Sequence, residues 1–405
     1  MSDFYLARQP ILDAAKSVFG YELLFRSSLQ NTYSATDGEY ATLDILSNAL
    51  FHTSLKRIVG PKRGFVNFTR DLLLTDVILL FPPEDIIIEV LEDVVPDDKI
   101  IAACRRLKES KYRIALDDFT KEDLNNPLVP LADFIKVDFL QVRDSDRKLI
   151  AARLLPLKVG LIAEKVETYG DYREGLALGY SFFQGFFFSK PVIQSGQRLD
   201  PSKIACMRML QEVFKEDCDY GELNEIISSD LSLSYRMLKL ANSPYFGFRK
   251  EITSIPHAIT LLGSSGVKRF ASLIAISAAM GNKPAELPLA CLVRARIMEE
   301  IAPLIGFADK APTLFLTGLF SLLDALLDCP MKEVLSELPI AHEIKSALLG
   351  EHNVLNNTLD ATVAYERGDW EQFRDTAATI KLREDLFPPI YTSAIEWATD
   401  LFQAM

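Results

Sequence analysis

Short apolar runs recur through the first half of the chain, and stretches with a different hydrophobic pattern separate them. The runs are rich in Val, Ile, Leu and Phe and are short enough for buried strands. They span residues 4–12, 18–25, 64–69, 85–92, 112–119, 134–140, 159–167 and 180–189. Over 97–111, by contrast, Ile100, Cys104 and Leu107 recur at helical spacing with charged residues between them. Strands that alternate with helices in this way predict a mostly parallel sheet covered by helices.

Eight such runs within residues 1–198 predict a TIM-type (β/α)8 barrel, slightly compact for its type. The first two runs, 4–12 and 18–25, leave little room for a helix between them. We therefore expect this pair to be an antiparallel hairpin, which would make the barrel irregular at its start.

The hydrophobic pattern changes near residue 200. From Ile204 to Met405 the chain is rich in Leu, Ala, Ile, Glu and Lys at helical spacing, and prolines break it into short segments. This pattern predicts an all-α domain over residues 199–405, joined to the barrel by a short loop that contains Pro, Gly and Ser.

The amino-acid composition limits the classes of function that this chain can have. The chain has 405 residues, is 49% hydrophobic and 25% charged, and carries a net charge of -12, as an ordinary globular protein does. The acidic balance argues against double-stranded nucleic acid as a partner but not against a small anionic ligand held by a metal. The five cysteines show no metal-type spacing, which favours free thiols in a reducing compartment. The N-terminus lacks a signal-peptide core and the apolar stretch 271–280 is too short to span a bilayer, so we expect a cytoplasmic protein without direct membrane insertion.

Most of the strand-like runs carry a polar side chain near their end. These side chains belong to Glu22, Asn67, Glu89, Asp117, Asp118, Lys136, Glu164 and Gln184. In a parallel barrel the carboxyl ends of the strands open on one face, where oxygen ligands can converge on a hard divalent cation. Taken alone, each has an ordinary alternative: Glu22 as a surface acid, and Asp117 and Asp118 as a helix cap. Whether they form a metal-dependent active site or only its remains is left open by the pattern.

Several short motifs occur in a fixed order along the first half. They are QPI (9–11), ELLFR (22–26), VNF (66–68), EVLE (89–92), DDF (117–119), KVD (136–138), AEKVE (163–167) and QGFFFSKP (184–191). In order and spacing they resemble the EAL domain, the cyclic-di-GMP phosphodiesterase family, over nearly its whole length. The second half resembles an HDOD domain, a non-catalytic relative of the HD phosphohydrolases, in the segments 231–270 and 315–324. Together the two halves look like an EAL–HDOD bacterial signalling protein.

The EAL resemblance implies hydrolysis of cyclic di-GMP to the linear dinucleotide with two Mg²⁺ or Mn²⁺ ions. Two metal ions activate a water and neutralise charge on the phosphate, and they prefer oxygen ligands. The implied metal ligands are Glu22, Asn67, Glu89, Asp117 and Asp118, with Asp117 shared between the ions. Glu164 and Gln184 complete the site, and Lys136 orients the attacking water, so Glu22, Lys136 and Glu164 are the implied catalytic residues.

The same resemblance assigns residues around the bound dinucleotide. Arg26 would grip a phosphate, and Gln9, Asp138 and Gln184 match positions beside the ligand. Glu92 and Glu167 match glutamates that support the loop on the metal side.

Two departures from the EAL pattern bear on catalysis. After Asp118 and Phe119 the family usually continues GTGYSS, whereas this chain has Thr120–Leu124 without a glycine. Lys165 stands where the family usually has glycine; its ammonium could compete with a cation for Glu164 or could point outward. Two hypotheses therefore stay open: an EAL-type phosphodiesterase, and an inactive EAL domain that binds cyclic di-GMP or serves as an interaction module.

The helical half lacks the ligands of an HD hydrolase. At the positions of the metal-binding His-Asp pair it has Ser321 and Leu322, which cannot replace that pair, so we expect no metal there. The HDOD resemblance implies a regulatory module that binds a protein partner, and it leaves a homodimer open. Motility and biofilm are the outputs that the family implies.

Overall fold

The structure is a computed structural model that describes residues 5–26, 55–191, 201–243, 246, 252–280 and 283–404. The chain divides into two compact units. The first contains Met1–Phe188 together with Tyr365–Trp370, and the second contains Ser189–Ala364 and Glu371–Met405. The domain boundary predicted between residues 198 and 199 lies within 192–200, outside the described residues.

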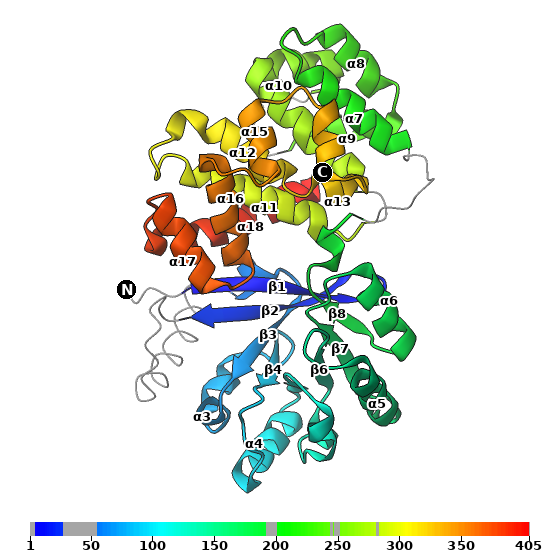
Figure 1. The fold of residues 1–405 in the computed structure, drawn as a ribbon, viewed down its shortest axis with the longest axis vertical. Coiled ribbons are helices and arrows are strands. Elements are labelled where there is room, and N and C mark those ends of the chain that lie inside the picture. The colour runs from blue at the N-terminus through cyan, green and yellow to red at the C-terminus, as the bar shows by residue number, and fades with distance from the viewer. Residues whose placement is uncertain are drawn as a thin grey trace. The chain divides into compact units, whose positions relative to one another are not determined.

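The strands of the first unit close into a barrel in sequence order (Figure 1). They are β1 (Tyr5–Asp13), β2 (Val18–Arg26), β3 (Arg63–Phe68), β4 (Ile86–Val90), β5 (Arg113–Leu116), β6 (Phe134–Asp138), β7 (Gly160–Glu164) and β8 (Phe182–Gln184). This confirms the predicted eight-stranded barrel. Strand β1 pairs antiparallel with both β2 and β8, and the remaining neighbours pair parallel.

Helices connect the parallel strands of the barrel and lie outside them (Figure 1). They are α2 (Leu55–Val59), α3 (Arg70–Leu73), α4 (Asp98–Glu109), α5 (Asp144–Leu154) and α6 (Tyr169–Leu178), with the 3₁₀ turns η1 (Asp76–Leu80), η2 (Lys121–Asn125), η3 (Val129–Leu131), η4 (Leu155–Leu157) and η5 (Phe187–Ser189). Helix α4 confirms the helix expected over 97–111. The Asp97 side chain caps it by accepting hydrogen bonds from the backbone N–H groups of Lys99 and Ile100, and Cys104 lies on its buried face.

An apolar layer fills the barrel interior beneath a polar one. The apolar layer consists of Ile11, Phe65, Ile87, Ala115, Phe134 and Ile162, with Phe19 and Phe182 packed against it. Side chains two residues apart on a strand share a face, so Phe65 is followed by Asn67, Ile87 by Glu89, and Phe134 by Lys136. In these parallel strands the period of two therefore places a polar residue one step above the apolar one, at the carboxyl end of the strand.

Gly185, directly after β8, allows the chain to pass very close to the loop after β7. Its φ is +142°, and a Cβ atom added there would lie 2.5 Å from the backbone nitrogen of Val166 and closer still to the Val166 oxygen. Both of these backbone groups are used, because Val166 N–H donates to the Gln184 carbonyl and Phe187 N–H donates to Val166 O. The contact holds the end of β8 against the residues that follow Glu164.

We predict that Gly185→Ala lowers the free energy of unfolding of the barrel by at least about 2 kcal/mol, because it combines an unfavourable φ with a backbone clash. The matched control is Gly60→Ala. Gly60 also has a positive φ, +62°, but an added Cβ there meets no atom within 4 Å among the described residues, so this variant should lose only about 1 kcal/mol. Urea-dependent hydrogen exchange of the barrel strands measures both. Equal losses in the two variants would contradict the clash.

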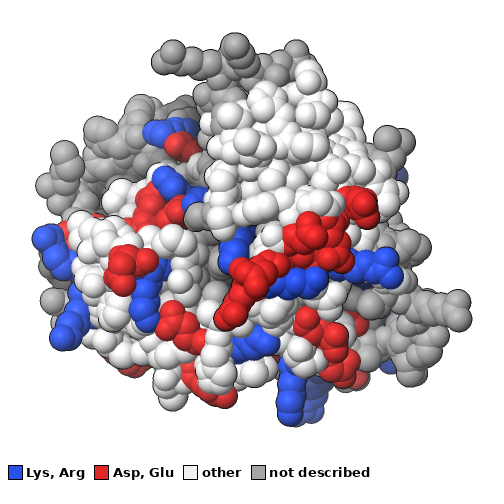
Figure 2. All heavy atoms as spheres, turned by 90° about the horizontal axis from the view of Figure 1, so that it is seen from above, with Lys and Arg blue, Asp and Glu red and all other residues white. Residues whose placement is uncertain are grey.

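The second unit is built from helices, as the sequence predicts. From residue 201 onward the chain forms α7 (Pro201–Val213), α8 (Tyr220–Ser228), α9 (Leu231–Ala241), α10 (Ile255–Ala279), α11 (Glu286–Ile301), α12 (Ala311–Phe320), α13 (Leu323–Leu327), α14 (Met331–Glu337), α15 (His342–Leu348), α16 (Val354–Glu366), α17 (Trp370–Thr379) and α18 (Phe387–Ala404), with 3₁₀ turns η6 (Ala308–Lys310) and η7 (Glu384–Leu386). Within the described ranges, none of the helices combines the length and the apolar character that crossing a bilayer requires. Figure 2 shows basic and acidic side chains interspersed over the described part of one face.

Candidate functional site

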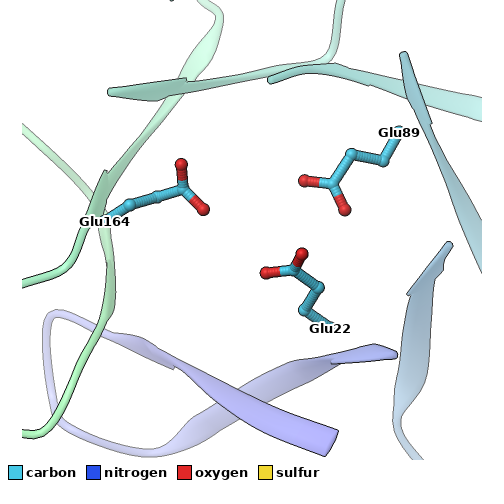
Figure 3. Close-up of side chains that lie close together, drawn as sticks. All are labelled: Glu22, Glu89 and Glu164. Carbon is cyan, nitrogen blue, oxygen red and sulfur yellow. The ribbon is translucent and has the colours of Figure 1, made fainter. Parts of the chain in front are cut away.

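Three glutamates from different strands meet inside the barrel (Figure 3). Glu22 extends from β2, Glu89 from β4 and Glu164 from β7. One carboxylate oxygen of each lies within 4.8 Å of those of the other two, and all three residues are buried. Since like charges at this separation repel strongly away from water, the arrangement needs a cation nearby or a proton on some of the carboxyl groups.

The ammonium group of Lys136, on β6, is the cation that the metal-free barrel places there. Its Nζ atom lies 3.3 Å from Glu22 Oε2 and 2.7 Å from Glu164 Oε1. It also lies 3.0 Å from Asp117 Oδ1 and in ion-pair contact with Glu89 Oε1. A single ammonium therefore contacts carboxylates from four different parts of the sheet, and Lys136 itself is only 1% exposed.

Burial and crowding shift the protonation of this group. Burial opposes the charge on Lys136, but the surrounding carboxylates outweigh it and raise its pKa well above the usual value. Burial raises the pKa of Glu89 well above normal, and it raises the pKa of Glu164 to about 8. For Glu22, burial is outweighed by the charge of Lys136 and by hydrogen bonds from Gln184 and Asn67, so its pKa is lowered. The site thus holds more acid groups than one ammonium can keep ionised.

Two side-chain amides donate hydrogen bonds to Glu22, and their own carbonyl oxygens receive none from the described residues. Asn67 donates from Nδ2 to Glu22 Oε1 over 3.3 Å, and Gln184 donates from Nε2 to Glu22 Oε2 over 2.5 Å. Within the part of the chain that the structure describes, no donor reaches Asn67 Oδ1, Gln184 Oε1 or Glu89 Oε2, although all three atoms are buried. Buried oxygens in this state fit a hard divalent cation, so the residues present suit such an ion.

A second group of oxygen ligands lies beside the first. Asp117, Asp118 and Glu164 each have a carboxylate oxygen within 4.8 Å of the others, and Glu164 belongs to both groups. Asp118 has a left-handed backbone, with φ of +41°. Burial and the neighbouring charge of Asp117 raise the pKa of Asp118, and the charge of Lys165 opposes them. Two adjacent ligand groups that share a carboxylate are the arrangement that a pair of cations would use.

Lys165 turns toward the site. Its Nζ atom lies 2.5 Å from Asp138 Oδ2, whereas the other oxygen of Asp138 accepts hydrogen bonds from the backbone N–H groups of Leu140 and Gln141. Asp138 is 2% exposed, and the Lys165 side chain is half exposed. The ammonium of Lys165 thus pairs with Asp138 rather than with Glu164, and half of its side chain stays exposed.

The remaining expected residues lie around the mouth of the barrel. Gln9, on β1, accepts a hydrogen bond from Gln184 Nε2 over 3.0 Å and donates one to the Arg367 carbonyl, which belongs to the same compact unit. Arg26 ends β2, four residues after Glu22 and on the same face of the strand.

The two supporting glutamates, Glu92 and Glu167, are exposed in the loops that follow β4 and β7. The charge of Glu92 contributes to the raised pKa of Asp118. The structure brings neither glutamate into the two ligand groups described above.

The loop that replaces the family's glycine-bearing sequence is a structured turn. Residues Lys121–Asn125 form η2, and Asp123 Oδ2 closes its start by accepting hydrogen bonds from both the N–H and the hydroxyl of Thr120. Lys121 pairs with Asp146 at the start of α5 over 3.1 Å. These contacts hold the loop close to α5.

In the helical unit the two residues at the His-Asp positions make ordinary packing and capping contacts. The Ser321 hydroxyl donates to the Gly318 carbonyl over 2.7 Å and accepts from Arg294 over 3.2 Å. Leu322 is buried.

Comparison with known proteins identifies the two halves. Residues 61–191 match the model of the EAL domain, and residues 201–338 match the model of the HDOD domain. YuxH of Bacillus subtilis is 34% identical over 408 residues, which cover 99% of this chain and 99% of the relative. The cyclic di-GMP phosphodiesterase CdgJ of Vibrio cholerae is 31% identical over 370 residues, which cover 91% of this chain and 86% of the relative.

A solved structure of Klebsiella pneumoniae BlrP1, a manganese and cyclic di-GMP complex, matches 46% of this chain and 55% of its own, with 23% identity and a TM-score of 0.39. The two relatives are similar along nearly the full length of the chain, and both domain models match in the predicted order. The chain belongs to the family of proteins in which an EAL domain is followed by an HDOD domain.

Proposed function

We propose that the chain is a cyclic di-GMP signalling enzyme whose EAL barrel hydrolyses cyclic di-GMP to the linear dinucleotide. The HDOD half serves as its regulatory and protein-binding module. The CdgJ relative, which is 31% identical, is a cyclic di-GMP phosphodiesterase, and this supports the substrate.

The main support for a metal-dependent enzyme is the set of buried oxygens at the carboxyl ends of the strands. Carboxylates crowd around Lys136, and buried oxygens of Asn67, Glu89 and Gln184 have no donor among the described residues. A structural ion pair would not need these additional acceptors, whereas a divalent cation would use them.

The family resemblance supplies the assignment of residues to metal ions, and the two ligand groups, which share Glu164, support it. Glu22, Asn67, Glu89 and Asp117 would hold the first ion. Asp117 would be shared with a second ion, which Asp118 and Glu164 would also hold. Bound Mg²⁺ or Mn²⁺ supplies an activated water and neutralises charge on the phosphate oxygens.

The protein's own groups then have separate tasks. Lys136 orients the attacking water from the centre of the carboxylates. Arg26 binds a phosphate of the dinucleotide, and Gln9, Asp138 and Gln184 position the ligand at the mouth of the barrel. Glu92 and Glu167 support the loops that flank the metal ions.

An assay with purified protein tests the enzyme directly. Cyclic di-GMP is incubated with Mg²⁺ or Mn²⁺, the linear dinucleotide is followed by chromatography, and Glu22→Ala is run in parallel. We expect product from the parent protein and about 100-fold less or none from the variant, which lacks a metal ligand. No product from the parent protein with either ion would refute the enzyme.

A non-enzymatic cyclic di-GMP receptor is the second candidate. The Lys165 ammonium beside the second ligand group and the altered Thr120–Leu124 turn favour it, because both change the surroundings of the second ion. Calorimetry of cyclic di-GMP binding, run beside the assay, distinguishes the two. Tight binding without turnover would establish the receptor.

A protein partner for the HDOD half and a homodimer belong to the same proposal. Light scattering of the purified chain with and without cyclic di-GMP tests the homodimer. A change in the turnover of cyclic di-GMP after substitution of an exposed residue of the helical half, such as Tyr235→Ala on α9, in the full-length chain tests regulation by that half.

A further inference from the structure

Lys165 combines a left-handed backbone with an ion pair to a buried carboxylate. Its φ is +50°, a left-handed conformation that a residue with a Cβ atom adopts at a cost of about 1–2 kcal/mol. Glycine would take the same conformation without that cost. Lys158 has a left-handed backbone as well, so what distinguishes Lys165 is the ion pair of its ammonium with Asp138.

The ion pair with Asp138 fixes the ammonium in place. Asp138 is buried, and the backbone N–H groups of Leu140 and Gln141 hold its Oδ1 atom, so its Oδ2 atom has a defined position for Lys165 Nζ at 2.5 Å. Burial opposes the charge of Lys165, but the hydrogen bond and the charge of Asp138 outweigh this and raise its pKa. The group remains a cation on the rim of the site.

This cation lies near the second ligand group. Asp138 pairs in register with Glu164 across β6 and β7, and Glu164 is a member of that group. Lys165 directly follows Glu164, and its charge acts on Asp118 and on Glu164 as well as on Asp138. A fixed positive charge beside three carboxylates weakens the attraction that a second divalent ion would experience there.

We propose that Lys165 is a specificity-determining residue that makes the two metal positions unequal. Lys136 contacts members of both ligand groups, so its charge acts on both, whereas the charge of Lys165 acts in addition on the second group. The position of Asp117, Asp118 and Glu164 therefore takes a divalent ion more weakly than the position of Glu22, Asn67 and Glu89. The inference rests on the proposed metal-dependent function, and it concerns the number and affinity of the ions.

Titration with Mn²⁺, read as free Mn²⁺ by electron paramagnetic resonance, tests the inference without any turnover. We expect one tight ion and one weak ion for the parent chain. In Lys165→Ala, which removes the charge and keeps the Cβ atom, the second ion should bind about 10–100-fold more tightly. Lys165→Gly should do the same, and Lys165→Arg should retain the weak second position.

Lys158→Ala is the matched control. Lys158 is also left-handed, with φ of +61°, and exposed, but it lies before β7 at the opposite end of the strand from Glu164. It should leave both Mn²⁺ affinities unchanged.

The outcomes separate the two proposals. Two equally tight ions in the parent chain, or no tightening in Lys165→Ala, would overturn the role of Lys165 and leave the metal site intact. Tightening in Lys165→Gly but not in Lys165→Ala would also overturn it, because backbone strain rather than charge would then be the cause. No tight ion in any variant would overturn the metal-dependent function together with the inference.

Discussion

Replacing Lys136 with methionine is expected to lower the free energy of unfolding of the metal-free barrel by about 3–5 kcal/mol at pH 8. The ammonium contacts Glu22, Glu89, Asp117 and Glu164, and Lys136 is almost fully buried. Methionine has a similar length but no charge, so the buried carboxylates lose their shared counter-ion. Turnover of cyclic di-GMP should fall by about 10²–10⁴-fold, the usual range for a positioned group that acts on the reacting water.

The stability loss of Lys136→Met should depend on pH. Burial already raises the pKa of Glu164 to about 8, and loss of the ammonium raises it further. A carboxyl group with a raised pKa in the folded state favours folding below its unfolded pKa and loses that contribution as pH rises toward the folded value. The defect should therefore be small at pH 5 and grow toward pH 8.

Urea-dependent hydrogen exchange of the peptides that contain β4 and β6, in EDTA, measures this loss. Lys148→Met is the control, because Lys148 is an exposed lysine of α5 and should change the stability by less than about 0.5 kcal/mol. Added Mn²⁺ should recover part of the loss in Lys136→Met, since a bound cation neutralises the same carboxylates. Equal stability of Lys136→Met and the parent chain at pH 8 in EDTA would contradict the counter-ion role.

Glu89→Gln is expected to separate stability from metal binding. Burial raises the pKa of Glu89 well above its usual value, so a neutral amide resembles the state that the metal-free barrel favours. We expect a change of less than about 1 kcal/mol in the stability of the metal-free barrel. The variant should nevertheless lose most of the Mn²⁺-dependent stabilisation, which for an intact site is about 2.7 kcal/mol at a concentration 100 times the Kd.

Hydrolysis by Glu89→Gln should fall by at least about 100-fold, because the variant removes a fully buried ligand of the first ion. Thermal unfolding with and without Mn²⁺, together with the chromatographic assay, measures both effects. Glu109→Gln makes the same chemical change at an exposed position of α4 and serves as the control. Normal Mn²⁺-dependent stabilisation in Glu89→Gln would show that Glu89 is not a ligand.

Much of the fold follows from local pattern. The spacing of the apolar runs predicted an eight-stranded barrel, and the helical period after residue 204 predicted the second unit; both are confirmed. The convergence of the polar side chains could also be predicted. Side chains two residues apart share a face, and the carboxyl ends of parallel strands open at one mouth of the barrel. Glu22, Glu89 and Glu164 meet there as the pattern indicated.

The contacts among side chains inside the site could not be predicted from the sequence. The resemblance assigned Lys136 to a water, and no local signal indicated that its ammonium contacts carboxylates that reach it from several strands. Distances across a barrel depend on how far neighbouring strands are staggered, as in the pairing of Asp138 with Glu164. That register arises from non-local pairing and cannot be obtained from the alternation within one strand.

Local sequence pattern is enough to predict the succession of a barrel and a helical domain and the polar residues at most strand ends. It also shows that a lysine stands at position 165, where the EAL family usually has glycine. These features depend on side-chain periodicity and on residue identity, which are local properties. The contacts of Lys136 with four carboxylates and the ion pair of Lys165 with Asp138 emerge only from the tertiary structure. Both outcomes depend on strand register and on a left-handed backbone at residue 165, and long-range packing sets these.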